Sequence, residues 1–132
     1  MSTALVHTPE LPTIEVWENL NAHRNYVISI SVPEFTSVCP KTGLPDFGTI
    51  TLDYVPDEVC VELKAFKYYI LGFRNMGIFY ENVVNKILDD VVKACNPRYL
   101  KVTGDFTARG GIATKVVATH VQPGFDLKQL PA

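Results

Sequence analysis

The chain has 132 residues, of which 47% are hydrophobic, so it is long enough for one folded domain with its own core. Its net charge is −2 and its lysines and arginines are dispersed, which argues against a nucleic-acid partner, because binding through phosphates needs a basic patch. No apolar run approaches the roughly 18 residues of a membrane-spanning helix, which argues against a membrane partner. The N-terminus lacks the features of a secretory signal and the three cysteines form no paired framework, so we expect a cytoplasmic protein.

The first half of the chain predicts an arm followed by two strands. Residues 1–20 are proline-bearing and irregular, which predicts an N-terminal arm that lies over a neighbour or frays, and residues 21–132 form the single domain. Residues 26–32 and 49–54 alternate apolar and polar side chains, as is typical of a strand with one buried face. Between them, residues 36–46 (TSVCPKTGLPD) contain two prolines and a glycine, which predict a stiff, shaped loop.

The second half predicts two helices and then two more strands. Apolar residues recur at helical spacing over 63–73, and again over 79–94 before an Asn-Pro pair stops the second helix. Alternation returns over 100–106 and, less regularly, over 112–121. This order predicts an α+β domain, with a four-stranded antiparallel sheet that carries two helices on one face. Its open sheet edges make self-association physically reasonable.

One cysteine and one carboxylate of the predicted loop have the residue types that covalent catalysis needs. A thiolate can attack an electrophilic carbon and a nearby carboxyl can supply a proton, so Cys39 and Asp46 are the candidate nucleophile and proton donor. Taken alone, this pair is a weak signal. A cysteine is often a small packing residue, as we expect for Cys60 and Cys95, and an Asp after Pro often stabilises a turn.

Five short motifs add to this pair. They are ELKAFKYY (62–69), RNMG (74–77), FYE (79–81), NPRY (96–99) and FTARGG (106–111). With Cys39 and Asp46, they resemble the NADPH-dependent 7-cyano-7-deazaguanine reductases, the nitrile reductases of queuosine biosynthesis, a tRNA modification, in their single-domain form. The resemblance covers roughly residues 20–120. It implies the tunnelling fold, in which subunit sheets join side by side into a barrel, and a homo-oligomer, a decamer of two pentameric rings with active sites at subunit boundaries.

The implied reaction reduces the nitrile of 7-cyano-7-deazaguanine to 7-aminomethyl-7-deazaguanine, with NADPH as cosubstrate. Four electrons are needed, and therefore two hydrides. A bare nitrile carbon is a poor hydride acceptor, whereas addition of a thiolate gives a thioimide with an activated C=N bond. The resemblance implies that Cys39 forms this thioimide and that Asp46 supplies protons to the nitrogen.

Two carboxylates are the implied contacts to the base. The deazaguanine has an amidine-like edge with two N–H donors, which one carboxylate can accept as a bidentate pair. Glu62 and Glu81 match the family positions, and the site would be lined by the backbone of Val61 and Leu63 and by Tyr80. The alternative is that a Glu at a helix start serves the helix dipole. Many relatives carry His where Tyr80 stands, and a phenol with a pKa of about 10 is a poorer acid–base group near neutral pH.

Three cations are the implied cofactor contacts. Lys64 and Lys67 share a helix face at positions i and i+3, where they would meet the 2′-phosphate and pyrophosphate of NADPH, and Arg109 is the third anion contact. The alternative for the lysines is a solvated helix face. No G-x-G-x-x-G motif follows a strand, so a Rossmann site is not supported, and the three scattered histidines lead us to expect no metal.

Two other functions stay open at this point. An amidine-forming transferase on the same fold would let an amine or ammonia attack the same thioimide, although those relatives lack the Glu-x-Lys-x-x-Lys segment that begins here at Glu62. A non-catalytic module would bind a purine-like ligand without forming an adduct. Consumption of NADPH when the nitrile is added separates the reductase from both.

Overall fold

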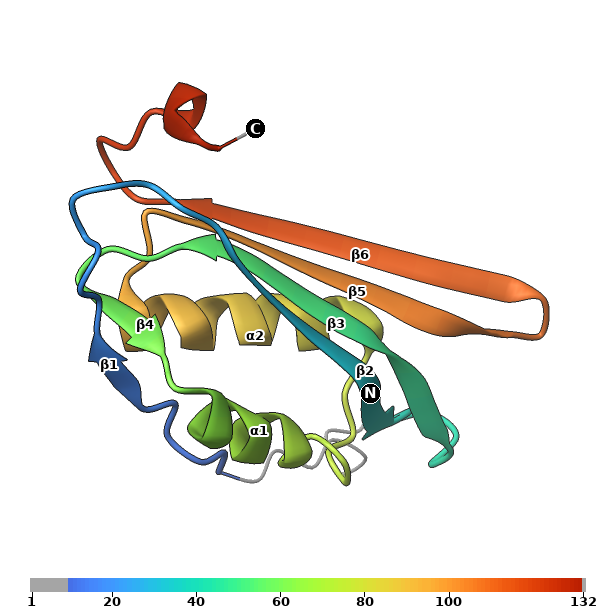
Figure 1. The fold of residues 1–132 in the computed structure, drawn as a ribbon. Helices are drawn as coiled ribbons and strands as arrows, with labels where there is room; N and C mark the ends of the chain where they lie inside the picture. The colour runs from blue at the N-terminus through green and yellow to red at the C-terminus, as the bar shows by residue number, and fades with distance from the viewer. Residues whose placement is uncertain (1–9, 132) are drawn as a thin grey trace.

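Four long strands form one antiparallel sheet in the order β2-β3-β5-β6, in a computed structural model that describes residues 10–131 (Figure 1). Their bounds are β2 Ile28–Val38, β3 Pro45–Val55, β5 Tyr99–Arg109 and β6 Ile112–Val121. Strands β3 and β5 are central, and β2 and β6 are the edges. The four strands that the alternating patterns predict are therefore confirmed.

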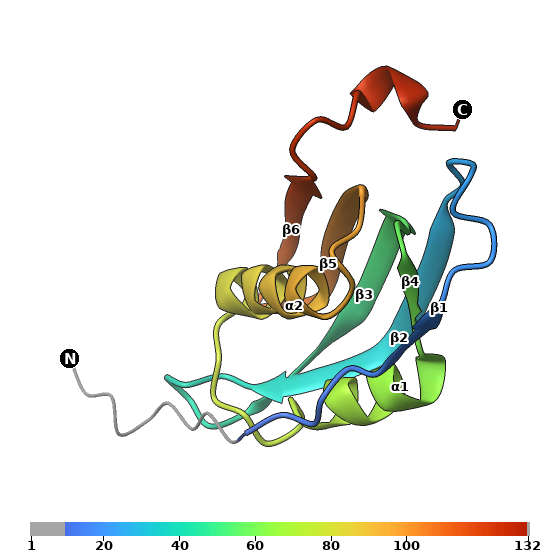
Figure 2. The ribbon, with the colours of Figure 1, turned by 90° about the vertical axis from the view of Figure 1, so that its left-hand side faces the viewer.

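Two helices, α1 (Leu63–Leu71) and α2 (Tyr80–Cys95), cover the same face of this sheet, as two views at right angles show (Figures 1 and 2). The buried side of α2 carries Val83, Val84, Ile87, Val91 and Cys95, which follow the helical period. Together with the sheet, these helices confirm the predicted α+β arrangement. No helix within residues 10–131 has the length and apolar character that crossing a membrane requires.

The core lies between the helices and the alternate residues of the strands. Ile50, Leu52 and Tyr54 of β3 are fully buried and face the helices, while the residues between them on the strand are partly accessible. The buried Tyr54 hydroxyl accepts a hydrogen bond of 2.9 Å from the Val61 backbone N–H. This bond ties the end of β3 to Val61, two residues before α1 begins.

The N-terminal segment is more ordered than its sequence predicts. Strand β1 (Val16–Glu18) pairs antiparallel with β4 (Val59–Val61), and together they form a separate two-stranded sheet. Three-residue strands are too short to produce a readable alternation, so the sequence gives no sign of them. The first nine residues of the expected arm lie outside the described residues. Beyond β6, the chain ends with the 3₁₀ turn η2 (Leu127–Gln129).

The segment 36–46 is a tight hairpin rather than a long loop. Strand β2 continues to Val38 and β3 begins at Pro45, so only residues 39–44 form the turn. The Cys39 N–H donates to the Leu44 carbonyl at 2.9 Å, and the Gly43 N–H donates to the Cys39 carbonyl at 2.8 Å. Gly43 has a φ of +73°, which a residue without Cβ adopts at little cost.

Two β-bulges change which residues face the helices. In β2, Val32 and Phe35 are three residues apart, whereas their partners on β3 are only two residues apart. In β5, Phe106 and Arg109 are likewise three residues apart, and their partners on β6 are two residues apart. One extra residue reverses the alternation of a strand. Before each bulge, the even-numbered residues of the strand face the helices. After the bulge, the odd-numbered residues face them.

Candidate active site

Asp46 is the centre of a polar cluster on the helix-facing side of the sheet. Its side chain is buried, and its Oδ1 atom accepts hydrogen bonds from the Tyr80 hydroxyl at 3.0 Å and from Arg109 Nη1 at 2.5 Å. The Thr36 hydroxyl also donates to the Asp46 backbone carbonyl at 2.8 Å. A buried carboxylate held by donors from α2 and β5 has the fixed position that proton transfer requires.

Cys39 is partly exposed in the hairpin turn. A hydrogen bond from the Thr42 side chain lowers the pKa of Cys39, and backbone N–H groups of Thr42 and Lys41 act in the same direction. Partial burial and the negative charge of Asp46 oppose this effect. The net effect is a lowered pKa, so the thiolate, which is the nucleophilic form, forms more readily than in a free cysteine, and the effect of the Asp46 charge shows that this carboxylate is near the thiol.

Tyr80 is held against Asp46 by an aromatic stack. Its ring lies on Phe106 with centroids 3.9 Å apart and planes at 13°. The pKa of Tyr80 is raised, chiefly by burial and then by its hydrogen bond to Asp46, so the hydroxyl stays protonated and donates. Gly48 and Gly104 make room for the Phe106 ring, because a Cβ at either position would lie within 2.8 Å of it.

Arg109 follows the β5 bulge, which directs it to the helix-facing side. Its guanidinium forms an ion pair with Asp46, and this hydrogen bond is the main cause that raises the pKa of Arg109. The arginine side chain stays 41% exposed, whereas that of Asp46 is 7% exposed. Arg109 is therefore next to the acid of the site and accessible to a ligand as well.

Glu62 caps the start of α1. Its carboxylate accepts hydrogen bonds from the backbone N–H groups of Lys64 at 2.7 Å and Ala65 at 3.0 Å. The arrangement is the helix-start role that the sequence left as an alternative, although the side chain remains partly accessible. Lys64 and Lys67 are exposed on the same helix, and Leu63 is 62% exposed.

The candidate residues fall into two groups within one chain. The hairpin group comprises Cys39, Asp46, Tyr80, Glu81 and Arg109, and the α1 group comprises Val61, Glu62, Leu63, Lys64 and Lys67. Val61 is bonded to Tyr54, which lies eight residues along β3 from Asp46. At about 3.3 Å per residue, the Val61 end of the α1 group is roughly 25 Å from Asp46 along the strand. Figure 1 shows the start of α1 beside β4, at the far end of the sheet from the β2–β3 turn.

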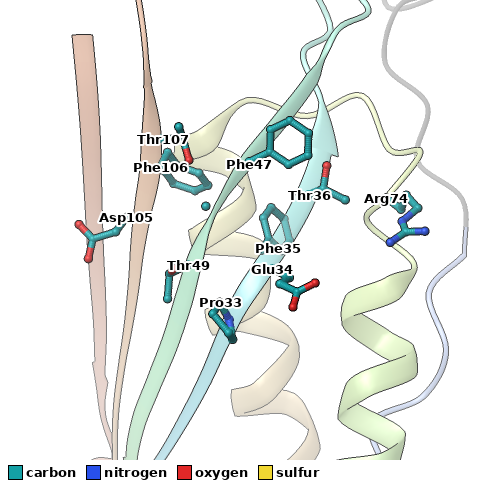
Figure 3. Close-up of a pocket in the computed structure, with 11 residues that line it drawn as sticks. Pro33, Glu34, Phe35, Thr36, Phe47, Thr49, Arg74, Asp105, Phe106 and Thr107 are labelled. Carbon is teal, nitrogen blue, oxygen red and sulfur yellow. The ribbon is translucent and has the colours of Figure 1, made fainter. Parts of the chain in front are cut away.

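A cleft of about 450 Å³ lies next to the hairpin group, with Thr36 and Phe106 in its wall. Figure 3 shows Arg74 reaching toward this cleft from the segment after α1, while Glu34 and Phe47 come from neighbouring strands. Cys39 and Asp46 do not line it. The cleft is large enough for a small ligand. A site that also included Cys39 and Asp46 would have to extend beyond its walls.

Several contributors were missed at the sequence level. Thr42, Thr36 and Phe106 act through contacts that depend on the hairpin register and on the aromatic stack. Phe106 and Arg74 lie in the motifs FTARGG and RNMG, and this membership is the only sign in the sequence that they are near the site. Among residues 10–131, no three His, Cys, Asp or Glu side chains are grouped so that they could hold a metal ion.

Comparison with known proteins identifies a family and a related fold. The sequence model of the QueF-like protein family matches residues 45–124. The chain covers 91% of a solved structure, the archaeosine synthase QueF-Like in the apo form, with a TM-score of 0.66, 27% identity and 70% of this chain aligned. The fold and the site thus define a tunnelling-fold protein of the QueF-like class.

The curated relatives identify the branch of this class. The NADPH-dependent 7-cyano-7-deazaguanine reductase of Elusimicrobium minutum (strain Pei191) is 63% identical over 84% of this chain and 83% of its own length. That of Chloroherpeton thalassium (strain ATCC 35110 / GB-78) is 62% identical over 85% of this chain and 95% of its own length. The chain belongs to the family of NADPH-dependent 7-cyano-7-deazaguanine reductases, which are oxidoreductases.

Proposed function

We propose that this protein reduces the nitrile of 7-cyano-7-deazaguanine to 7-aminomethyl-7-deazaguanine with NADPH, in queuosine biosynthesis. The observation that carries the proposal is that one hairpin places Cys39, a thiol with a lowered pKa, near the buried carboxylate of Asp46, whose charge acts on that thiol. The names of the curated relatives support the substrate and the reductant.

The first step is addition of the Cys39 thiolate to the nitrile carbon. The Cys39 thiol proton passes to the Asp46 carboxylate as the thiolate forms. The S–C bond then forms, one π pair of the C≡N bond moves to nitrogen, and nitrogen takes this proton from Asp46. The product is a thioimide bound to Cys39, and Asp46 is again a carboxylate. Tyr80 and Arg109 hold the carboxyl group in place through Oδ1.

The later steps need two hydrides, which NADPH supplies in two successive bindings. Reduction of the thioimide and loss of the Cys39 thiolate leave an imine, and the second reduction gives the primary amine. With two protons taken up, the equation is balanced at two NADPH per nitrile. Asp46 is the group positioned to donate to the nitrogen.

Glu62 and Glu81 are the proposed partners of the base, with the backbone of Val61 and Leu63 and with Tyr80 lining the site. Glu81 is exposed in the first turn of α2, next to Tyr80, and is free to face a ligand. Glu62 has carboxylate oxygens on the α1 N–H groups, and each oxygen has a second lone pair for a ligand donor. Both side chains suit a bidentate contact to an amidine-like edge.

Lys64, Lys67 and Arg109 are the proposed cofactor contacts, and their chemistry fits a phosphate-bearing cosubstrate. The two lysines are exposed on α1 and make no ion pair within residues 10–131. Arg109 contacts Asp46 through Nη1 and can keep this bond while its remaining guanidinium N–H groups donate to a phosphate. We include no metal in the reaction.

The separation of the two groups supports a site that is assembled from two copies of the chain. A base held by Glu62 cannot reach Cys39 of the same chain across roughly 25 Å. We therefore propose a homo-oligomer in which the α1 group of one subunit faces the hairpin group of its neighbour, with the decamer of two pentameric rings as the arrangement.

The three free cysteines fit a reducing compartment such as the cytoplasm.

The test combines an adduct measurement with an oxidation assay. Incubation with the nitrile alone is expected to add one substrate mass to the wild type, and none to Cys39→Ala. Cys60→Ala, which changes a buried cysteine outside the site, is the matched control and should keep the adduct. NADPH should then be consumed at two equivalents per nitrile.

Three other outcomes have distinct meanings. An adduct that yields an amidine with ammonia and consumes no NADPH favours the transferase, a reading to which the archaeosine synthase neighbour gives some support. Tight binding without an adduct favours the non-catalytic purine-binding module. No binding at all overturns the proposed substrate.

A further inference from the structure

Ser37 has a fully buried hydroxyl beside the active-site acid, and this hydroxyl has no hydrogen-bond partner within residues 10–131. A buried polar group without a partner costs free energy, because its hydrogen bonds to water are lost and not replaced. Such groups are rare in native proteins, and each one calls for an explanation. At Ser37 the explanation lies in the residue directly opposite.

Ser37 and Asp46 are register partners on β2 and β3. Directly opposite residues of an antiparallel pair have side chains on the same face, with Cβ atoms about 4.5–5.5 Å apart. Ser37 follows the β2 bulge, so it faces the helices together with Phe35, as Asp46 does on β3. Without the bulge, the hydroxyl would lie on the opposite face of the sheet.

Only one of the two carboxylate oxygens of Asp46 accepts hydrogen bonds from the described residues. Its Oδ1 atom accepts from both Tyr80 and Arg109, whereas its Oδ2 atom has no protein partner in the described part of the chain. An unused carboxylate oxygen and an unused buried hydroxyl thus belong to two directly paired residues. Each is the hydrogen-bond partner that the other lacks.

We propose that Ser37 is a positioning residue for Asp46, whose hydroxyl donates to Oδ2 when the nitrile occupies the site. The inference rests on the proposed function and extends it to Ser37, a residue to which the motifs assign no role. A carboxyl oxygen has two hydrogen-bonding positions, so Ser37 occupies one and the nitrile nitrogen the other. With Oδ1 held by Tyr80 and Arg109, this bond stops rotation of the carboxyl group and directs its proton to the substrate.

The experiment uses Ser37→Ala in the full-length protein. The rate of adduct formation with the nitrile is expected to fall about tenfold or more, the loss typical of a hydrogen bond to a charged group. The melting temperature is expected to stay the same or rise, because the variant removes a buried hydroxyl that has no partner. Affinity for the base should change little, because Ser37 acts through Asp46.

Two further variants sharpen the result. Ser31→Ala changes an exposed serine on the same strand and should match the wild type in rate and stability. Ser37→Thr restores a hydroxyl and should recover a large part of the rate, since β-branched residues suit strands.

The outcomes separate this inference from the proposed function. An unchanged adduct rate in Ser37→Ala overturns the positioning role. So does a rate loss that comes with a lowered melting temperature, since that result indicates a structural serine. If the wild type itself forms no adduct, the proposed function fails, and this inference fails with it for a different reason.

Discussion

At the scale of single residues, Thr42 determines how readily Cys39 ionises. Its side-chain hydrogen bond is the largest influence on the pKa of Cys39, and it acts against burial and the Asp46 charge. The bond stabilises the charged thiolate, so its loss must raise the pKa and shift reactivity to higher pH. The turn 39–44 therefore does more than connect two strands.

We expect Thr42→Val to move the pH dependence of Cys39 alkylation to higher pH, and Thr42→Ser, which keeps the hydroxyl, to leave it near the wild type. The measurement is the rate of iodoacetamide labelling at Cys39 between neutral and alkaline pH, read by peptide mass spectrometry. Cys95 is an internal control, because burial raises its pKa to about 12. Equal profiles for the Val and Ser variants would contradict this role of Thr42.

Tyr80 contacts Asp46 through a phenol hydroxyl, and its surroundings explain how a phenol serves there. Burial and the bond to Asp46 keep the hydroxyl protonated, so it does not shuttle protons near neutral pH. Its stacking on Phe106 fixes the ring, and the hydroxyl then holds the carboxylate. A histidine could add a titrating group at this point, whereas the tyrosine offers a constant donor.

At the scale of secondary-structure elements, the start of α1 combines a structural role with a proposed binding role. Glu62 caps the helix through two backbone N–H groups. Loss of an N-cap side chain typically costs about 1 kcal/mol of stability. A neutral side chain with a carbonyl oxygen can still accept from an N–H, whereas it cannot form the charged bidentate contact to the base.

We expect Glu62→Ala to lower the free energy of unfolding by about 1 kcal/mol and to lose affinity for the base. Glu62→Gln should lose affinity while keeping most of the stability. Urea denaturation and calorimetric titration with the base measure the two effects separately. If Gln binds the base as the wild type does, Glu62 is a helix cap only.

The elements that the sequence predicts well are those with long periodic patterns. Helix α2 and the paired strands β3 and β5 repeat their pattern over many residues, and their existence follows from the period alone. Strands β1 and β4 are too short for a period. The β2 bulge interrupts the alternation at Pro33, which is why the predicted first strand stops at Val32 rather than Val38.

The same distinction applies to the site. Motifs identify Cys39, Asp46 and Arg109 as individual residues, because their types and order are visible in the sequence. The contacts of Asp46 with Tyr80, and its pairing with Ser37, depend on strand register and on where α2 begins. Register is a property of the folded sheet, so no local pattern in the sequence could reveal those neighbours.

At the scale of the whole molecule, the two halves of the proposed site lie at opposite ends of the sheet. A single chain would then have all the required residues and yet no complete site. Activity should therefore depend on which chains adjoin one another. Two variants that damage different halves provide a direct measure of this dependence.

We expect mixtures of Cys39→Ala and Glu62→Ala subunits, each inactive alone, to regain activity after they are dissociated and reassembled together. With random assembly, about a quarter of the boundaries would combine two intact halves. The measurement is NADPH oxidation in the mixture. A mixture that remains as inactive as its components would place the whole site within one chain.

The two bulges have a consequence for how this protein tolerates insertions and deletions. Removing a single residue near Pro33 or Thr107 would eliminate the bulge, and every later residue of that strand would then face the opposite side of the sheet. Cys39 in one case and Arg109 in the other would then turn away from Asp46, although every residue of the proposed catalytic set would still be present. Loss of one residue outside the proposed catalytic set is thus expected to lower activity more than many substitutions within the site.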